Sequence, residues 1–586
     1  MFRKIREKIE TTSWMLPVLF ALASFLLFLP ALFLVQLPMM DVLTRYAPMA
    51  DAFAAGDWNT AFHPRVPPYL PVMGGIFSYL FSCSGFMGVK LASLLMFSLS
   101  FLALIPLFRR IFSLRTTIIG GVLAMFCSHY LRLVVAGLRE SGKGFFFTLG
   151  AYALVRIYQE KQKKTGFLLL GLACGGMIYV RDDSVLAAIL FVLTAMVMEI
   201  CRSRSFPWRT LLFSCCAAVV IAIPLLASNY RMTGYPVPSY RFIPIVSKFV
   251  PYSVFGEPEF RKELMRNEKK WAEQQKNLEE KWAAEFSAKK QTQGSGKQEI
   301  RPRQFNDIAR EVYRPEAENY LTPRHFLVAF SKMIQGGHIY FIFPALLVIV
   351  LRICKKQWKT EETILLLVPV LHALLIFLQV LIADGRAWLT ERYLLALSPM
   401  MLCWAGIALE AVYDFTKKWL NNDPLHKKLT AAVSVLLLCL LYVDSISAEI
   451  RSWTSSRQRA RQLLLYEWAE LVRNDYKGET GEPYFYLDHK AYRSFRRPRI
   501  YSEEFTELGY FSGGETMSLL FIWGDTRESY MRMYDMASIH YGGIDYLAEE
   551  VPGDWDAVPE GFEIMDDRKD VGGKRCILLK RKDTMQ

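Results

Sequence analysis

The chain has 586 residues, of which 52% are hydrophobic and 22% are charged. The hydrophobic fraction is high, yet the charged fraction is close to the average of soluble proteins. The chain must therefore alternate long apolar segments with polar ones. That combination is typical of a polytopic membrane protein with sizeable aqueous parts. The net charge of +14 does not indicate a nucleic-acid partner, because 22 of the 70 Lys and Arg residues lie in six short segments beside the apolar ones.

Eleven segments are apolar over a length close to the roughly 20 residues that a helix needs to cross a bilayer core. The first is an uncharged run from Trp14 to Leu37 with no small-x-small cleavage pattern behind it, so we predict a retained span and not a signal peptide. The eleven predicted spans are 14–37, 86–108, 116–134, 144–158, 165–180, 184–201, 210–228, 338–353, 362–383, 393–413 and 429–446.

Positive charge gathers in every second connection between these segments. The positive-inside rule places those connections in the cytoplasm, and the odd number of spans places the C-terminus outside. We therefore predict a transmembrane domain over 1–447, with outer loops at 38–85 and 229–337, and a soluble extracytoplasmic domain over 448–586. The predicted cytoplasmic segments are 1–14, 109–115, 156–164, 202–209, 352–359 and 417–428.

The tail from residue 448 onward is predicted to be a small α/β domain. Apolar runs at 484–488, 519–523 and 576–579 indicate short buried strands, and the patterns at 458–473 and 526–540 indicate helices. The tail has no glycine-rich phosphate loop and no metal-spaced histidines. A structural or acceptor-recognition role is therefore favoured over catalysis.

The second outer loop carries a charged run from Phe260 to Lys290, in which Trp271 and Trp282 stand among Glu and Lys residues. This pattern is typical of a surface helix with i,i+4 ion pairs, followed here by a flexible Gly-Ser linker. A solvated insertion is one interpretation. A lid or a guide for an acceptor is the other.

Metal-binding and disulfide patterns are weak. The ten cysteines lie mostly inside or beside apolar segments and form no CxxC pattern, so neither a disulfide framework nor a zinc motif is predicted. His63 and His338 lie near outer positions without ligand spacing, which leaves the metal unassigned. His372 lies inside the ninth predicted span, where a hydrogen bond within the bundle is favoured over catalysis.

The short outer loops contain more cations than the orientation rule predicts. Ionisable groups at membrane depth are costly and usually face a cavity or a partner. One interpretation pairs each cation with a nearby acid such as Glu140, Asp182 or Glu391. The other is that the cations together bind lipid phosphate, because guanidinium grips phosphate oxygens bidentately. The set comprises Arg132, Arg139, Lys143, Arg181, Arg386 and Arg392.

Several short motifs follow one another in order over about 400 residues. The first outer loop opens on Asp41 and contains Thr44-Arg45-Tyr46-Ala47, Gly56-Asp57-Trp58 and Pro67-Pro68. Later come Leu138-Arg139-Glu140, Tyr179-Val180-Arg181-Asp182, the turn at 229–239, and Glu391-Arg392-Tyr393-Leu394-Leu395 with Pro399. With this topology, the set resembles the C-type glycosyltransferases (the GT-C fold), especially the lipid A aminoarabinose transferases and the protein O-mannosyltransferases.

The resemblance implies a GT-C-like helical membrane fold and inverting transfer of a sugar, a hexose or a pentose, from a polyprenyl-phosphate donor. In such enzymes an acid of the first loop takes the proton from the acceptor hydroxyl, which makes Asp41 the implied base and Glu140 a second catalytic acid. Positive charge near the leaving phosphate is also implied. The residues implied for lipid phosphate and sugar are Arg45, Tyr46, Arg139, Arg181, Arg392 and Tyr393.

The implied partners are the polyprenyl-phosphate sugar, a lipid, glycan or protein acceptor, and membrane lipids. Some relatives hold a divalent metal ion between loops, which makes such an ion a candidate cofactor here. The resemblance also implies a bacterial cytoplasmic membrane, with the active site and the C-terminus on the periplasmic side.

The first motif departs from the family in its spacing. Relatives usually have Asp-Glu with the tyrosine four residues beyond the aspartate, whereas here Tyr46 is five beyond Asp41 and Val42 replaces the glutamate. Either one residue is inserted, or Asp41 is not equivalent and only caps a helix. Asp51 and Asp57 are then the alternative bases, although Asp57 is typical of a turn. For Glu140, the alternative to catalysis is a salt bridge to Arg139 or Lys143.

Two other functional classes stay open. Charges at membrane depth also line the pathways of transporters and lipid flippases, although no inverted repeat is visible in the sequence. A noncatalytic protein that only binds lipid-linked sugar is the third class. Replacement of Asp41 by Asn distinguishes them, because an enzyme loses turnover and a transporter is largely indifferent.

Overall fold

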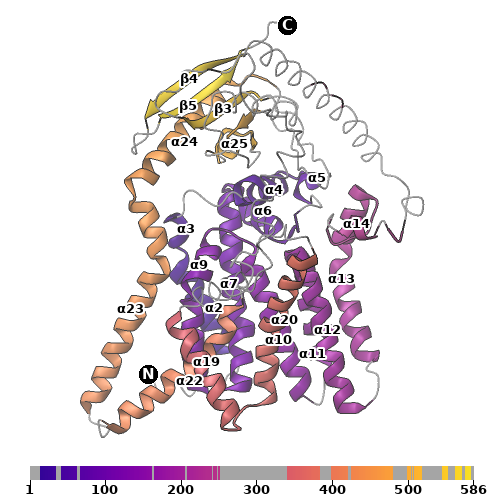
Figure 1. The fold of residues 1–586 in the computed structure, drawn as a ribbon, viewed down its shortest axis with the longest axis vertical. Coiled ribbons are helices and arrows are strands. Elements are labelled where there is room, and N and C mark those ends of the chain that lie inside the picture. Colours follow the sequence, from indigo (N-terminus) through magenta and orange to yellow (C-terminus); the bar gives the residue numbers. More distant parts are fainter. Residues whose placement is uncertain are drawn as a thin grey trace, which may run out of the picture. The chain divides into compact units, whose positions relative to one another are not determined.

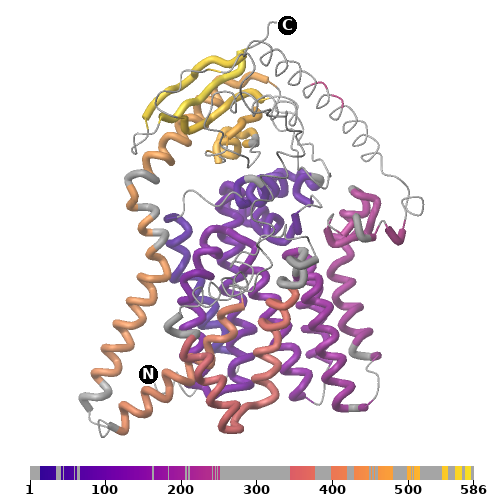
Figure 2. Tube along the Cα trace, viewed as in Figure 1, coloured from indigo at the N-terminus to yellow at the C-terminus, as the bar shows by residue number. Residues whose placement is uncertain are grey.

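The structure is a computed structural model that describes residues 14–34, 41–62, 66–160, 164–204, 208–239, 242–250 without 247, 339–382, 397–419 and 424–478. In the last 90 residues it describes mainly 498–502, 507–517, 544–551, 561–569 and 575–582. Figure 2 shows these segments in colour along the chain. They form two compact units, the first made of Met1–Tyr230, Pro236–Ile243 and Leu321–Thr454, and the second of Arg231–Tyr235, Pro244–Tyr320 and Ser455–Gln586.

The first unit is a helical bundle with α7 at its centre, where α7 packs against α2, α6 and α10 (Figure 1). Its core is a continuous cluster of apolar side chains that includes Phe97, Phe101 and Tyr130, whose rings meet edge to face. The helices are α2 (Met15–Phe28), α3 (Ala31–Leu34), the π-helix η1 (Val42–Tyr46), α4 (Ala47–Ala54), α5 (Trp58–Ala61), α6 (Tyr69–Phe81), α7 (Gly85–Ile111), α8 (Leu114–Met125), α9 (Ser128–Val135), α10 (Glu140–Gln159), α11 (Lys164–Val180), α12 (Asp182–Ser203), α13 (Trp208–Thr233), α19 (Ile339–Cys354), α20 (Thr360–Ile382), α22 (Ser398–Trp419) and α23 (Pro424–Thr454). The short helix α14 (Ile243–Val246) belongs, apart from its first residue, to the second unit.

Each of the eleven predicted spans coincides with one helix or with a bent pair of helices, but fewer are long and apolar enough to cross a membrane. Within the described residues five helices meet that requirement, and six do if α8 and α9, which bend by 51°, count as one span. The helix α11 has 17 residues, at the lower end of the length that crosses a bilayer core. The chain is thus an integral membrane protein, and its number of spans stays a prediction.

Three of the predicted cytoplasmic segments meet at one end of the bundle. The Lys359 ammonium donates to the carbonyl of Ile111 over 3.2 Å, and the Gln159 amide donates to the carbonyl of Arg110 over 3.2 Å and to Glu361 over 3.0 Å. These bonds join 109–115, 156–164 and the turn between α19 and α20. The alternation of connections between the two ends of the bundle therefore follows the charge pattern in this part of the chain.

A buried ion pair closes the same end of the bundle. Arg352 holds Glu362 through two bonds of 2.6 and 3.0 Å, and the indole of Trp404 donates to the same carboxylate over 3.1 Å. The pair links the end of α19 to the start of α20 and to α22. A buried carboxylate that is satisfied in this way holds three helices in one arrangement.

The second unit contains a five-stranded sheet in the order β2-β1-β3-β5-β4. The strand β1 (Arg499–Tyr501) is parallel to β2 (Glu515–Met517) and to β3 (Tyr546–Val551), whereas β5 (Arg575–Arg581) is antiparallel to β3 and to β4 (Phe562–Lys569). The predicted strand 576–579 is present within β5. The predicted helix 458–473 is present within α24 (Ser456–Asp475), and a short α25 (Leu508–Ser512) precedes β2.

The helix α24 is fixed to the sheet by side-chain bonds at two points. Trp468 donates to Asp566 of β4 over 2.5 Å, and the Tyr546 hydroxyl of β3 donates to Asp475 over 2.6 Å. The predicted strands 484–488 and 519–523, the predicted helix 526–540 and the charged run 260–290 lie outside the described residues.

Candidate functional site

The first outer loop begins with one turn of π-helix. Asp41 is the residue before Val42–Tyr46, and the N–H of Ala47 donates to the carbonyl of Val42, five residues back. An α-helical turn closes with bonds of four residues, so this turn holds one residue more. Bonds of i→i+5 place residue i+5 above residue i, as bonds of i→i+4 do in an α-helix. Single π turns inside α-helices occur frequently at functional sites.

The extra residue places Asp41, Arg45 and Tyr46 on one face. The Arg45 guanidinium lies 3.1 Å from the Asp41 carboxylate, and the two side chains keep 32% and 22% of their exposure. In a regular α-helix Tyr46 would point about 140° away from Asp41, since each residue turns the chain by about 100°. The π turn thus explains how Asp41 and Tyr46 can be five residues apart and still lie on the same face of the helix.

The Tyr46 ring lies beneath several charges. Its side chain is only 1% exposed, and the Arg139 guanidinium lies 5.9 Å from the ring centroid, within the range of a cation–π contact. Burial raises the pKa of the Tyr46 phenol, whereas the nearby Arg139 charge lowers this pKa. The carboxylates of Asp41 and Glu140 raise the same pKa further, and Arg45 lowers it. Residues of the first loop and of the Leu138-Arg139-Glu140 motif therefore surround one buried ring.

A buried ion pair joins this group to a third motif. An Nη of Arg181 lies 2.6 Å from Oε1 of Glu140, and both side chains are buried. Glu140 is the first residue of α10, where the positive end of the helix dipole favours an acid. Arg181 is the extended residue between α11 and α12. Arg181 is thus a partner of Glu140 that the sequence motifs did not indicate, and a salt bridge of Glu140 to Arg139 or Lys143 stays a prediction.

The turn that leads into Glu140 is held by hydroxyl groups of neighbouring helices. Ser93 of α7 lies 3.0 Å from both the carbonyl of Leu138, to which it donates, and the hydroxyl of Ser141. The Tyr130 hydroxyl of α9 donates to the carbonyl of Glu140 over 3.4 Å. These bonds fix the backbone on both sides of Arg139.

The alternative acids of the first loop have helix-capping contacts. Asp51 accepts the N–H of Gly85, at the start of α7, over 2.5 Å. Asp57 caps α5 by accepting the N–H of Thr60 over 3.1 Å, which agrees with its prediction as a turn residue. Both contacts are typical of acids at helix N-termini.

The remaining predicted site residues lie outside the described residues. These are Arg392 and Tyr393 in the segment 383–396, and the histidines His63 and His338. Within the described residues, no group of three or more His, Cys, Asp or Glu side chains is arranged to hold a metal ion. The metal therefore stays a prediction.

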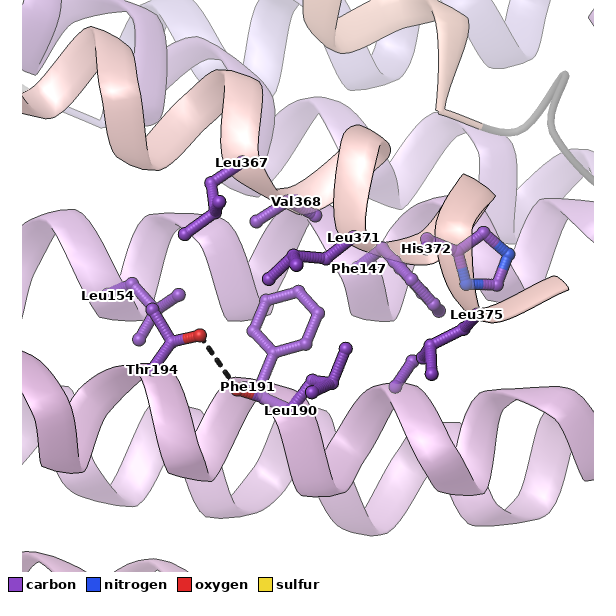
Figure 3. Close-up of a pocket in the computed structure, with 11 residues that line it drawn as sticks. Phe147, Leu154, Leu190, Phe191, Thr194, Leu367, Val368, Leu371, His372 and Leu375 are labelled. Carbon is purple, nitrogen blue, oxygen red and sulfur yellow. Dashed lines mark hydrogen bonds between the residues drawn. The ribbon is translucent and has the colours of Figure 1, made fainter. Parts of the chain in front are cut away.

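A small cavity of about 20 Å³ lies between α10, α12 and α20 (Figure 3). Its walls are apolar, and His372 lines one end, where its imidazole meets the Phe147 ring at 4.8 Å. The Thr194 hydroxyl donates to the carbonyl of Leu190 within its own helix. A space that holds about one water molecule is too small for a sugar.

The charge pattern singled out no residue within the second span, yet that span carries a buried lysine. Lys90 of α7 is 1% exposed and donates to the carbonyl of Leu32. Lys90 could have been found from the sequence, because it is a lone lysine near the start of the apolar segment 86–108, and ionisable groups within apolar segments are costly and often functional.

Solved structures with a similar arrangement include the Archaeoglobus fulgidus oligosaccharyltransferase tethered to an acceptor peptide with the NVT sequon, at 13% identity and a TM-score of 0.49, over 90% of this chain and 69% of that one. ArnT from Cupriavidus metallidurans bound to undecaprenyl phosphate has the same identity and TM-score, over 98% of this chain and 99% of that one. No curated protein matches the sequence significantly.

The family comparison covers part of the helical unit. Residues 65–227 match the sequence model of the family described as dolichyl-phosphate-mannose-protein mannosyltransferase. The matched range includes Arg139, Glu140 and Arg181 and begins after Asp41. The resemblance to membrane glycosyltransferases, predicted from the order of the motifs, is thus confirmed over residues 65–227 by a match to the protein mannosyltransferase family.

Proposed function

We propose that the protein is an inverting glycosyltransferase that moves a sugar from a polyprenyl phosphate to an acceptor hydroxyl at the outer face of the membrane. The observation that carries the proposal is the meeting of three separate motifs around Tyr46 and Glu140. The family matched by residues 65–227 is described by a donor of this class, a sugar on dolichyl phosphate.

Asp41 is the proposed general base. Its carboxylate is partly exposed, so it can reach an acceptor, and Arg45 lies 3.1 Å from it. As the acceptor oxygen attacks the anomeric carbon, the carboxylate takes the hydroxyl proton and the bond between that carbon and the phosphate oxygen breaks. The electron pair leaves with the lipid phosphate, and the configuration at the anomeric carbon inverts.

The leaving phosphate needs positive charge close by. Arg45, Arg139 and Arg181 bring three guanidinium groups to two carboxylates, which leaves this cluster with one net positive charge. Within the described part of the chain, the buried Nε of Arg139 has no hydrogen-bond acceptor. A phosphate oxygen would supply one, and a planar guanidinium is suited to that contact. Arg139 is therefore the first proposed ligand of the lipid phosphate.

Glu140 and Tyr46 are buried and act through their neighbours. Glu140 holds Arg181 in place, and Tyr46 supports Arg139. Arg392 and Tyr393 stay proposed contacts to donor or sugar, a divalent metal stays a candidate cofactor, and the C-terminal sheet is proposed to help recognise the acceptor outside the cytoplasm.

Transfer of a labelled sugar tests the proposal. The purified full-length chain in lipid nanodiscs is given a panel of synthetic polyprenyl-phosphate hexoses and pentoses together with membrane extracts as acceptors. Labelled product with inverted anomeric configuration is expected from at least one donor, and its migration with lipid, glycan or protein names the acceptor class. Binding of the donors without transfer to any acceptor fraction would contradict the enzymatic function and favour a lipid-sugar binder.

A further inference from the structure

Lys90 has a buried amino group that the proposed chemistry does not use. It lies in the second turn of α7, inside a helix long and apolar enough to cross a membrane, and its side chain is 1% exposed. An ammonium group removed from water is costly unless it is well bonded. Because the amino group of Lys90 is enclosed by protein, we expect it to hold neighbouring segments of the chain in place and not to bind a ligand.

The ammonium of Lys90 holds the end of the first span. It donates to the carbonyl of Leu32 in α3, close to the last described residue of the apolar segment Met15–Leu34. The Phe86 ring, 4.6 Å from the nitrogen, adds a cation–π contact. From this anchored end the chain continues to Asp41.

The stem of Lys90 supports a second segment, the turn before Glu140. Gly137 of this turn has a φ of +80°, and a Cβ there would lie 3.2 Å from Cγ of Lys90. Ser93, three residues further along the same face of α7, bonds to Leu138 and Ser141. One face of α7 thus touches both the segment that leads to the first-loop acid and the turn that carries Arg139 and Glu140.

We propose that Lys90 is a positioning residue that ties these two segments to α7. Asp41 and Arg139 are almost a hundred residues apart in the sequence, yet both must meet at the Tyr46 ring. The common anchor sets the distance between them. The effect on transfer rests on the proposed function, whereas the anchoring itself does not.

Hydrogen exchange of the full-length protein in nanodiscs tests the anchoring directly. Lys90→Met removes the charge and keeps the length of the side chain. We expect faster exchange in the peptides covering 31–47 and 134–141, because the local free energy of opening falls where a bond is lost. Lys90→Arg keeps a charged donor and restores most of the protection. If Lys90→Met does not fold, Lys90→Arg compared with the wild type still tests the proposal, because any exchange that this variant leaves faster must be confined to these two peptides.

A matched control separates anchoring from general loss of stability. Arg352→Met breaks a buried ion pair at the opposite end of the bundle, so its faster exchange is expected around 352–362 and 404, with 31–47 and 134–141 unchanged. The proposal would be overturned if Lys90→Met left the exchange of 31–47 and 134–141 unchanged. It would also be overturned if Lys90→Met and Arg352→Met both raised exchange over the whole bundle in the same way.

Kinetics then connect the anchor to the reaction. A misplacement of about 1 Å can lower turnover by about 10²-fold, so kcat of Lys90→Met is expected to fall by about that factor, with the KM for the donor changed much less. A raised donor KM at unchanged kcat would assign Lys90 to substrate binding and overturn the positioning role. If the wild type transfers no sugar, the proposed function fails, and the exchange data alone still decide whether Lys90 anchors the two segments.

Discussion

Asp41 and Tyr46 are five residues apart, and one turn of π-helix stacks them on the same face. The turn also leaves Arg45 within 3.1 Å of the acid. The π turn thus lets Asp41 and Tyr46 share one face although five residues separate them. The π turn therefore links the local backbone to the proposed chemistry.

Removal of the extra residue is expected to be tolerated. Deletion of Thr44 converts the turn to α-helix and leaves the acid and the tyrosine at i and i+4, which again share a face. We expect kcat within about tenfold of the wild type, since the orientation of the acid is kept. The comparison is an alanine inserted after Thr44, which turns the acid away by about 100° and should abolish transfer. A deletion as inactive as the insertion would mean that the π geometry itself is needed.

The Glu140–Arg181 pair is expected to show strong coupling. Glu140→Gln or Arg181→Met alone leaves a buried charge without its partner, which typically costs about 3–5 kcal/mol. The double variant removes both charges and should be more stable than either single one. Thermal unfolding in nanodiscs measures this double-mutant cycle. Additive losses across the cycle would show that the two side chains do not depend on each other.

The positions of the apolar helices could be predicted from the sequence, because hydropathy reports directly on the bilayer. The three segments that meet near Lys359 were predicted to share one side, and they do lie at one end of the bundle. The number of spans is harder to predict, because a short helix such as α11 can also pack inside a bundle, so apolar length alone does not decide it.

The site was harder to predict. Side-chain pairs such as Glu140 with Arg181 join residues that are distant in the sequence, so charge pattern favoured the local partners Arg139 and Lys143. Whether an extra residue forms a π turn depends on hydrogen bonds and not on residue type. A lone lysine in an apolar segment marks Lys90 in the sequence, but its bond to the carbonyl of Leu32 could not be predicted, because no sequence pattern marks a backbone acceptor.

Arg139 is expected to bind the lipid phosphate through its planar head group. Arg139→Lys keeps the charge but loses the forked donors, so the affinity for polyprenyl phosphate should fall about tenfold. Binding of a fluorescent polyprenyl phosphate measures the loss. The exposed Arg132 offers a matched control, and Arg132→Lys should bind as the wild type does. Equal affinities of the two variants would remove Arg139 from the phosphate site.

The raised pKa of Tyr46 predicts an alkaline loss of stability. In the unfolded chain a tyrosine loses its proton near pH 10, whereas burial keeps Tyr46 protonated in the folded protein above that pH. The unfolded state then binds fewer protons, so the free energy of unfolding falls as the pH rises above about 10. Tyr46→Phe should make this fall less steep, while phenylalanine at the exposed Tyr79 should not. Equal slopes in the two variants would contradict a buried, protonated Tyr46.

The most direct test of the account is the turnover of Asp41→Asn in single-turnover transfer from the preferred polyprenyl-phosphate sugar. Loss of a general base typically lowers the rate by 10²–10⁴-fold, while binding of the donor should stay within a few-fold of the wild type. Asp51→Asn and Asp57→Asn are the matched controls, because asparagine also caps helices, and both should keep their turnover. Unchanged transfer by Asp41→Asn, or an equal loss in Asp51→Asn, would contradict Asp41 as the base.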